Sequence, residues 1–240
     1  MSQIKEIAAY WGTRAQGYSE RCKIDLAERG QFDWLDKICK YAPVQQLKVL
    51  DIGCGAGFFS ILMAKAGHHV TAVDYTENMV NSAKQNAQDA GVTVQVLQMD
   101  AQNLSFADDT FDLIVTRNVT WVMEQPERAY SEWLRILHTG GKIINFDENH
   151  YLYLFDEDYR RAKESRAQLD YMKKVHNTHV MEELAYHLPL SQQVRPQWDV
   201  ETLCSLGASN VVADVYHKDV IEKDGQSRVL YHSFVVCAEK

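Results

Sequence analysis

An apolar stretch that runs directly into a glycine-rich turn constrains this 240-residue chain more than any other feature. The sequence VLDIGCGAGFFS at 49–60 predicts a buried strand, a sharp turn and the start of a helix. Glycine lets the backbone turn tightly and approach a ligand closely, and the free N–H groups at a helix start point toward a polar group. We therefore expect a nucleotide pocket at the end of this strand.

The spacing of the glycines limits which nucleotide this pocket can hold. A dinucleotide-binding fingerprint has the pattern G-x-G-x-x-G. Here the glycines are Gly53, Gly55 and Gly57, and Phe58 stands where the third glycine of that pattern is expected. This spacing weakens an interpretation in which the turn binds a pyrophosphate.

Composition favours a cytoplasmic protein of one domain with a small insertion. With 46% apolar residues the chain is long enough to bury a full core. Its longest uncharged apolar runs are far shorter than the roughly 18 residues that span a bilayer. The N-terminal residues 1–18 lack the basic and apolar regions of a signal peptide. We therefore predict no membrane span.

Cysteine usage and charge argue against further classes of protein. The five cysteines are odd in number, scattered and never in C-x-x-C spacing, so we expect reduced thiols rather than disulfides or structural zinc. The formal net charge of −8 argues against general nucleic-acid binding, although a local basic patch stays open.

Predicted helices and strands alternate along most of the chain. Strands separated by helices imply a parallel sheet that is covered on both faces. We expect helices at 2–14, 20–41, 57–67, 76–90 and 125–138, and strands at 47–52, 69–73, 92–97, 111–116 and 142–146, with a turn at 139–141.

This alternation stops after Asp147. Residues 154–187 are highly charged and predicted to be helical, and the pattern returns with a helix at 199–206 and strands near 210–216 and 228–237. The insertion follows the carboxyl end of a strand, where open α/β sheets bind ligands. We therefore expect it to form a lid or substrate cap.

Three aspartates stand at the ends of the first three predicted strands. Asp74 can accept hydrogen bonds from both hydroxyls of a ribose, as acidic residues do in NAD and S-adenosylmethionine sites. Asp100 suits the exocyclic amine of an adenine lying across the sheet, which favours an adenosine without a second nucleotide. Asp51 is expected to organise the glycine turn, because a buried carboxylate needs hydrogen-bond donors around it.

With these positions the sequence resembles the class I S-adenosylmethionine-dependent methyltransferases over about residues 10–147. VLDIGCGAG is similar to the family's first motif, Asp74 to its ribose-binding acid, and Asp100-Ala101 to its adenine-contacting pair. FDLIVTRNV looks like the family's fourth strand, and LHTGGK like the turn before the fifth, with Thr139 where proline is common. Within the family the chain resembles the small-molecule branch related to quinone-biosynthesis methyltransferases, whose N-terminal aromatic residues fold over the cofactor; the corresponding positions are Tyr10, Trp11, Arg14 and Tyr18.

The resemblance implies a doubly wound, mostly parallel, seven-stranded Rossmann-like α/β sheet with an antiparallel last strand and a helical lid after the fifth strand. It implies S-adenosyl-L-methionine as cofactor, S-adenosyl-L-homocysteine as product and a small-molecule methyl acceptor. The chain then divides into four parts. Residues 1–45 form N-terminal helices that cover the cofactor, and residues 46–150 form the cofactor-binding core. Residues 151–190 form a lid or substrate cap, and residues 191–240 form a C-terminal helix with the closing strands.

The same resemblance implies the cofactor contacts. The backbone of the glycine turn meets the amino-acid portion, and Arg117 or Arg14 is available to its carboxylate. The implied cofactor-binding residues are Tyr18, Asp51, Gly53, Cys54, Gly55, Asp74, Tyr75, Met79, Asp100, Ala101 and Asn118.

The acceptor site is less defined. Trp11, Trp121 and Tyr153 are candidates for substrate binding, and a base is needed only if the acceptor is protonated at neutral pH. His150 and Tyr151 are the candidate catalytic residues, and His150 has the most suitable intrinsic pKa. Other ionisable side chains at the same strand end are Asp147 and Glu148.

The lid histidines do not predict a metal site. His187 lies eleven residues from His176, about 16 Å along a helix, so one ion cannot bind both. His176 and His179 could share an ion, but no further ligand is assured.

Other functions stay open. The lid's basic residues allow a methyltransferase acting on RNA or protein, although TRNV at 116–119 is unlike the catalytic N-P-P-Y tetrapeptide of enzymes that methylate amino groups of bases. An NAD-dependent oxidoreductase and a non-catalytic cofactor-binding module are further alternatives. The oligomeric state is open between a monomer and a homodimer.

Overall fold

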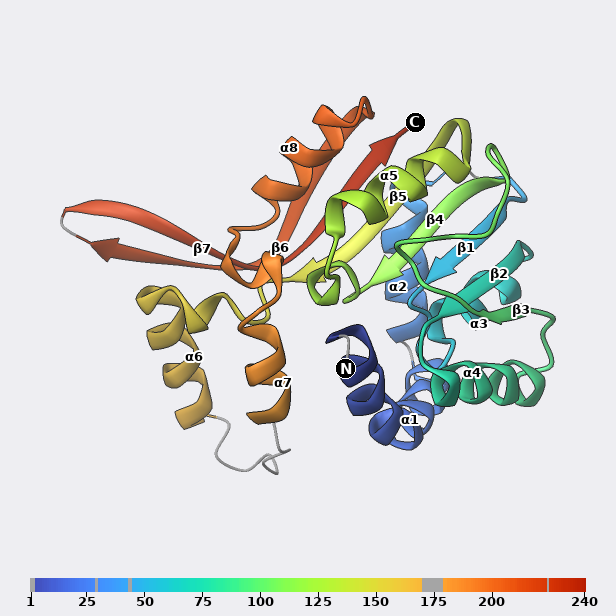
Figure 1. Cartoon of the computed structure of the whole chain (residues 1–240), viewed down its shortest axis with the longest axis horizontal. Helices are drawn as coiled ribbons and strands as arrows, with labels where there is room; N and C mark the ends of the chain where they lie inside the picture. Colours follow the sequence, from blue (N-terminus) through green and yellow to red (C-terminus); the bar gives the residue numbers. More distant parts are fainter. Residues whose placement is uncertain (1–2, 29, 43–44, 170–178, 224) are drawn as a thin grey trace.

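The computed structural model describes residues 3–28, 30–42, 45–169, 179–223 and 225–240 (Figure 1). At its centre is a seven-stranded sheet in the order β3-β2-β1-β4-β5-β7-β6. The first five strands pair in parallel, and β7 pairs antiparallel with both β5 and β6. The predicted fold class is therefore confirmed. The strands are β1 (Lys48–Ile52), β2 (His69–Asp74), β3 (Gln95–Gln98), β4 (Phe111–Arg117), β5 (Leu137–Glu148), β6 (Ser209–Lys223) and β7 (Gln226–Glu239).

Helices cover both faces of this sheet (Figure 1). The neighbouring residues Val49 and Leu50 of β1 pack in opposite directions, Val49 with Ile38 of α2 and Leu50 with Trp133 of α5. A strand buried on both faces needs apolar residues at consecutive positions, which explains the continuous apolar run in the sequence. The helices are α1 (Gln3–Ala27), α2 (Gly30–Cys39), α3 (Phe58–Lys65), α4 (Glu77–Asp89), α5 (Pro126–Ile136), α6 (Glu157–Leu169), α7 (His179–Ala185) and α8 (Gln197–Ser205), with 3₁₀ turns η1 (Thr120–Val122), η2 (Leu152–Leu154) and η3 (Pro189–Gln192).

The N-terminal helix is longer than predicted. We expected separate helices at 2–14 and 20–41, but α1 continues without a break through Gly17 and ends at Ala27. Glycine in a helix interior costs about 1 kcal/mol relative to alanine. Tertiary contacts offset that cost: for example, the Ser19 hydroxyl donates a hydrogen bond of 2.9 Å to Asn86 of α4.

The last three strands, β5, β6 and β7, are also several residues longer than predicted. Residues 139–141, expected as a turn, lie inside β5, because Leu137 already pairs with Phe111 before the register shifts. Gly140, with φ of 80°, accommodates this irregularity. β6 and β7 form a long hairpin that extends past the body of the sheet (Figure 1).

The predicted lid comprises α6, α7 and the 3₁₀ turns beside them, and residues 170–178 of it lie outside the described residues. The start of α6 is attached to the hairpin by ion pairs. Arg228 Nη2 lies 2.5 Å from Asp156 Oδ2, and Lys223 Nζ lies 3.0 Å from Asp158 Oδ2. The start of α6 is therefore fixed to the hairpin rather than standing free.

Candidate active site

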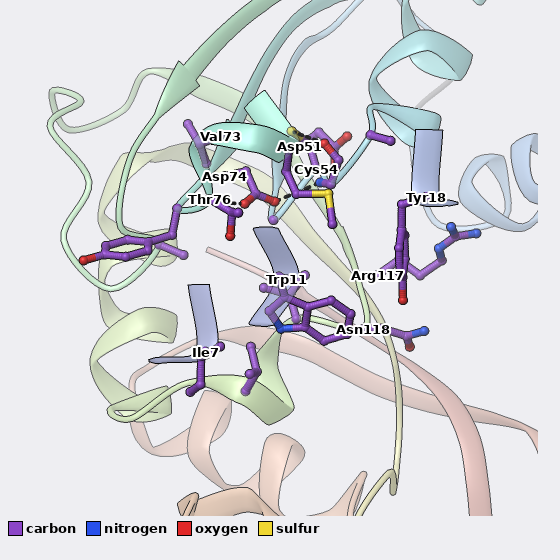
Figure 2. A pocket seen from close by; sticks show the side chains of 18 of the residues that line it. Ile7, Trp11, Tyr18, Asp51, Cys54, Val73, Asp74, Thr76, Arg117 and Asn118 are labelled. Carbon is purple, nitrogen blue, oxygen red and sulfur yellow. Dashed lines mark hydrogen bonds between the residues drawn. The ribbon is translucent and has the colours of Figure 1, made fainter. Parts of the chain in front are cut away.

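A pocket of about 380 Å³ lies where β1, β2, β3 and β4 end (Figure 2). Every residue that the sequence predicted as a cofactor contact, from Tyr18 to Asn118, lines this pocket. Trp11, Trp121, His150 and Tyr151 line it as well. The tertiary structure thus brings the predicted cofactor-binding, catalytic and substrate-binding candidates together, with the exception of Tyr153.

The glycine turn has a backbone that other residues rarely adopt. Gly53, Gly55 and Gly57 have φ angles of 63°, 52° and 89°. A Cβ atom on Gly53 would also lie 2.4 Å from Cγ2 of Val119. Glycine is therefore required at position 53 by both backbone conformation and space. Phe58, in place of the third glycine of a dinucleotide site, begins α3 and is buried in the core.

Asp74 is held by the backbone at the edge of the glycine turn. The N–H of Gly55 donates to Oδ2 at 2.9 Å, and the N–H of Thr76 donates to Oδ1 at 2.8 Å. Burial raises the pKa of Asp74, and these two hydrogen bonds oppose the increase. A carboxylate has about four acceptor positions. Asp74 therefore keeps some capacity to accept a further hydrogen bond.

The other two aspartates also support the pocket. Asp51 is buried and accepts a hydrogen bond of 2.5 Å from Ser60 of α3, which agrees with a role in organising the turn. Burial raises its pKa to about 7. Asp100 uses Oδ1 to accept hydrogen bonds from the backbone and side chain of Gln102, at 2.9 and 3.1 Å. In the part of the chain that the structure describes, its second oxygen accepts no hydrogen bond.

α1 lines the pocket along much of its length, which the sequence analysis missed in part. Besides Trp11 and Tyr18, its residues Arg21, Cys22 and Asp25 face the pocket. They continue the spacing of three and four residues that defines one helix face. We expected the first helix to end before residue 20, so these residues were not assigned to its face. Continuing the helical spacing through Gly17 would have placed them there.

Arg117 lines the pocket from the end of β4, and Arg21 lines it from α1. The Arg117 guanidinium lies over the rings of Phe58, Phe59 and Trp34, at 5.0 to 5.2 Å from their centres. Burial lowers its pKa, although Asp25 and Asp51 oppose that effect. Arg14, the alternative candidate for a cofactor carboxylate, is not among the lining residues.

Aromatic side chains form one wall. The ring centres of Trp11 and Trp121 are 6.3 Å apart, and Trp121 lies 5.1 Å from Tyr151 and 4.9 Å from His150. Trp121 Nε1 donates to the Asn118 carbonyl at 3.0 Å, which fixes its indole. This wall is therefore largely aromatic.

Tyr153 lies outside the pocket lining. Its hydroxyl donates a hydrogen bond of 2.5 Å to Glu182 of α7, and the Lys163 ammonium lies 3.2 Å from its ring centre. Tyr153 therefore joins α7 to α6 in this structure.

The lid histidines are only partly described, because His176 falls outside the described residues. His179 has a side chain that is 77% exposed and lies 3.3 Å from Glu183. Within the described part of the chain, no three His, Cys, Asp or Glu side chains gather in a way that could hold a metal ion.

Comparison with known proteins agrees with this fold and pocket. Residues 50–145 match the methyltransferase domain family. A crystal structure of an S-adenosylmethionine-dependent methyltransferase from Aquifex aeolicus superposes with a TM-score of 0.55 at 19% identity, over 92% of this chain and 97% of that one. The fold is Rossmann-like, and residues 50–145 of it are similar to a methyltransferase domain.

Two curated relatives match the same region. The ubiquinone biosynthesis O-methyltransferase of Rhizobium etli is 32% identical over 152 residues, 60% of each chain. The phosphatidylethanolamine N-methyltransferase of Cereibacter sphaeroides is 32% identical over 99 residues, which are 40% of this chain and 48% of that one. The chain spans about half the length of the curated relatives it matches. Their names differ in the atom that is methylated.

Among the described residues, no helix combines the length and apolar character that crossing a membrane requires.

Proposed function

We propose that this protein transfers a methyl group from S-adenosyl-L-methionine to a small-molecule acceptor and releases S-adenosyl-L-homocysteine. The observation that carries the proposal is the position of Asp74 beside the glycine turn, with Asp100 and Arg117 in the same pocket. A pocket of about 380 Å³ is within the usual range of roughly 300–1,000 Å³ for small-molecule sites.

The residues present fit this cofactor along the whole pocket. Asp74 has free acceptor capacity for the ribose hydroxyls, and Asp100 has an oxygen available for the adenine amine. Tyr75, Met79 and Ala101 supply apolar surface for the adenine ring. The backbone of Gly53 and Gly55, with Asn118 and Arg117, faces the place of the methionine portion.

Bound S-adenosylmethionine supplies an electrophilic methyl group on a sulfonium, whose departure leaves a neutral thioether. The protein has to align the acceptor with this methyl group and exclude water. Such positioning can lower a barrier by up to about 7–11 kcal/mol in well-oriented systems. Trp11, Tyr18 and Trp121 enclose the pocket with aromatic faces, which also attract a cation.

A small acceptor fits the lid better than a nucleic acid does. The basic residues at the start of α6 are engaged within the lid: Arg161 Nη2 lies 2.5 Å from Glu157, and Lys163 Nζ lies 3.2 Å from Glu182. Arg160 donates to the backbone carbonyls of Tyr153 and Leu154. Because these basic side chains already have partners, they are less available to bind RNA. A cytoplasmic location and a monomer or homodimer stay predictions.

Titration calorimetry tests the proposal. S-adenosyl-L-homocysteine should bind the protein, and Asp74→Ala should weaken binding about 10- to 100-fold, because charge-assisted hydrogen bonds contribute roughly 1.5–3 kcal/mol. Asp89→Ala, at the exposed end of α4, is the matched control and should bind as the wild type does. Absence of binding to the wild type, or equal binding to Asp74→Ala, contradicts the proposal. Thermal stabilisation by NADH in its place would favour an oxidoreductase.

A further inference from the structure

The outer edge of β6 has no strand beside it. β6 is the last strand in the sheet order, and among the described strands it pairs with β7 alone. It is 15 residues long, and the hairpin that it forms with β7 projects past the body of the sheet (Figure 1). The outer side of such a strand presents backbone N–H and C=O groups that can pair with another extended chain. β6 is therefore a long template for strand pairing.

The side chains of β6 leave this edge less protected than is usual. Proline and charged side chains, lysine above all, commonly block pairing at a sheet edge. Residues 209–223 contain no proline. Val212, Tyr216 and Val220 are exposed on this strand, and Val220 is 60% exposed. Exposed apolar residues on an edge strand favour association with another strand.

These three apolar residues share one face of the sheet with Asp214 and Lys218, because alternate residues of a strand point to the same side. The pairing with β7 is irregular between Val215 and Lys218, where the register shifts twice. Before the irregular part, Val215 pairs with Phe234. Three residues further along each strand, Lys218 pairs with Tyr231, so the two shifts cancel. The alternation of faces is therefore the same before and after them.

Contacts with α2 identify this face. Lys40, just after α2, donates a hydrogen bond of 2.5 Å to Asp214, and Lys37 Nζ lies 5.1 Å from the ring centre of Tyr216. Asp214 and Tyr216 therefore lie on the side of the sheet that α2 covers. The Asp214 side chain is still 46% exposed, so α2 leaves it accessible to a further partner.

The order of residues on this face is complementary to itself. Taken at every second position from 212 to 220, it reads Val, Asp, Tyr, Lys and Val. In an antiparallel pair of two β6 strands with a two-fold axis at Tyr216, Val212 of one copy stands opposite Val220 of the other. Asp214 then stands opposite Lys218, and symmetry produces each pair twice. Opposite charges across two strands stabilise a sheet, whereas like charges destabilise it.

Neighbouring registers lack this match. An axis at Val215 would place Lys218 opposite Val212, and an axis at His217 would place it opposite Tyr216. A lysine in those registers would keep two edges apart, because its charge would have no counterpart across the strands. The residues of this face therefore favour one register for two copies of β6.

We propose that two copies of this protein associate through their β6 strands, antiparallel and around a two-fold axis at Tyr216, so that their sheets become one continuous sheet. The Asp214 carboxylate of each copy then lies between Lys40 of its own chain and Lys218 of the second copy. This association does not depend on the proposed function. No residue of β6 is among the described residues that line the pocket, so each copy keeps its own pocket.

Charge reversal across the two-fold axis tests the register. Sedimentation equilibrium of the wild type should show a dimer. Lys218→Asp and Asp214→Lys each place like charges opposite one another, and each should raise the dimer Kd roughly 10-fold or more. Mixing the two variants in equal parts restores both opposite-charge pairs, so a mixed dimer should form. The matched control is Lys84→Asp, an exposed position on α4, which packs against β3 at the other end of the sheet order.

Each outcome bears on the proposal. Circular dichroism and unchanged binding of S-adenosyl-L-homocysteine relative to wild type show that the variants are folded. A wild type that stays monomeric overturns the proposal and leaves the edge of β6 to an extended segment of a different protein. A dimer that neither variant weakens, or a mixture that forms no mixed dimer, also overturns it.

Amide hydrogen exchange tests the interface without changing a charge. Raising the wild-type concentration above the dimer Kd should slow exchange in residues 209–223, because pairing would protect the outward N–H groups of β6. Exchange in β3, at the opposite edge of the sheet, should stay the same. A dimer that forms without added protection in β6 associates through another surface and contradicts the proposal.

Discussion

The Arg195 guanidinium lies 2.8 Å from Asp147 Oδ2, and the two side chains are only 1% and 0% exposed. Asp147 belongs to the carboxyl end of β5, whereas Arg195 precedes α8 and also binds Asp199 inside that helix at 2.6 Å. Tyr130 of α5 donates a further hydrogen bond of 2.5 Å to Asp199. This buried ion pair therefore connects the end of β5 to α8 and α5, directly behind the pocket.

Replacing Arg195 by leucine should strongly destabilise the protein. The substitution leaves the Asp147 and Asp199 carboxylates buried without their cation, and breaking a buried pair in this way costs about 3–5 kcal/mol. Urea unfolding of wild type and Arg195→Leu measures the difference. The control is Arg161→Leu, whose exposed pair with Glu157 should contribute about 1 kcal/mol or less. Similar losses in the two variants would contradict the importance of the buried pair.

Gly53→Ala should lower both stability and affinity for S-adenosyl-L-homocysteine. The new Cβ would lie 2.4 Å from Val119 Cγ2, and the φ of 63° adds about 1–2 kcal/mol for a residue with a side chain. Val119→Ala removes the atoms that clash. The double variant should therefore recover part of the loss, leaving the cost of the backbone conformation. Calorimetry and thermal unfolding of the four proteins form a double-mutant cycle, and strictly additive losses would argue against the clash.

Asp51 should make stability depend on pH. Its pKa is about 7 in the folded protein and 3.8 as the reference value for an unfolded chain, so the folded state holds the extra proton between these values. Its contribution to the free energy of unfolding is therefore lost as pH rises from about 4 to about 7.

Asp51→Asn cannot ionise and can still accept the hydrogen bond from Ser60. The stability of Asp51→Asn minus that of wild type should be roughly 2–4 kcal/mol larger at pH 8 than at pH 4. This figure follows from about 1.4 kcal/mol per pKa unit. Urea unfolding across this pH range measures the gain, with Asp89→Asn at the exposed end of α4 as the control. A difference between Asp51→Asn and wild type that stays constant with pH would contradict the raised pKa.

Much of the central sheet could be predicted from local sequence. Strands such as Phe111–Arg117 are apolar at consecutive positions because helices cover both of their faces, and this pattern is visible in the sequence. The length of the β6–β7 hairpin was underestimated for the opposite reason. Much of β6 is exposed, so its side chains carry little periodic signal, and its pairing with β7 sets its length.

The sequence by itself determined which residues gather where the strands end at the pocket. Gly53, Gly55, Asp74 and Asp100 follow directly after strands, and parallel strands bring their carboxyl ends to one edge of the sheet. Residues at such positions must meet, whatever the rest of the chain does.

Only the tertiary structure decided the surroundings of Asp147 and His150, at the end of β5. Arg195 lies 48 residues from Asp147, and nothing in its local sequence distinguishes it from an arginine exposed to solvent. Whether a cation is buried depends on which carboxylates the fold places around it, since an unpaired buried charge is too costly. The same holds for His150: its position in the sequence made it a candidate, but the Asp147 carboxylate 3.7 Å from its ring and the aromatic wall are properties of the folded chain.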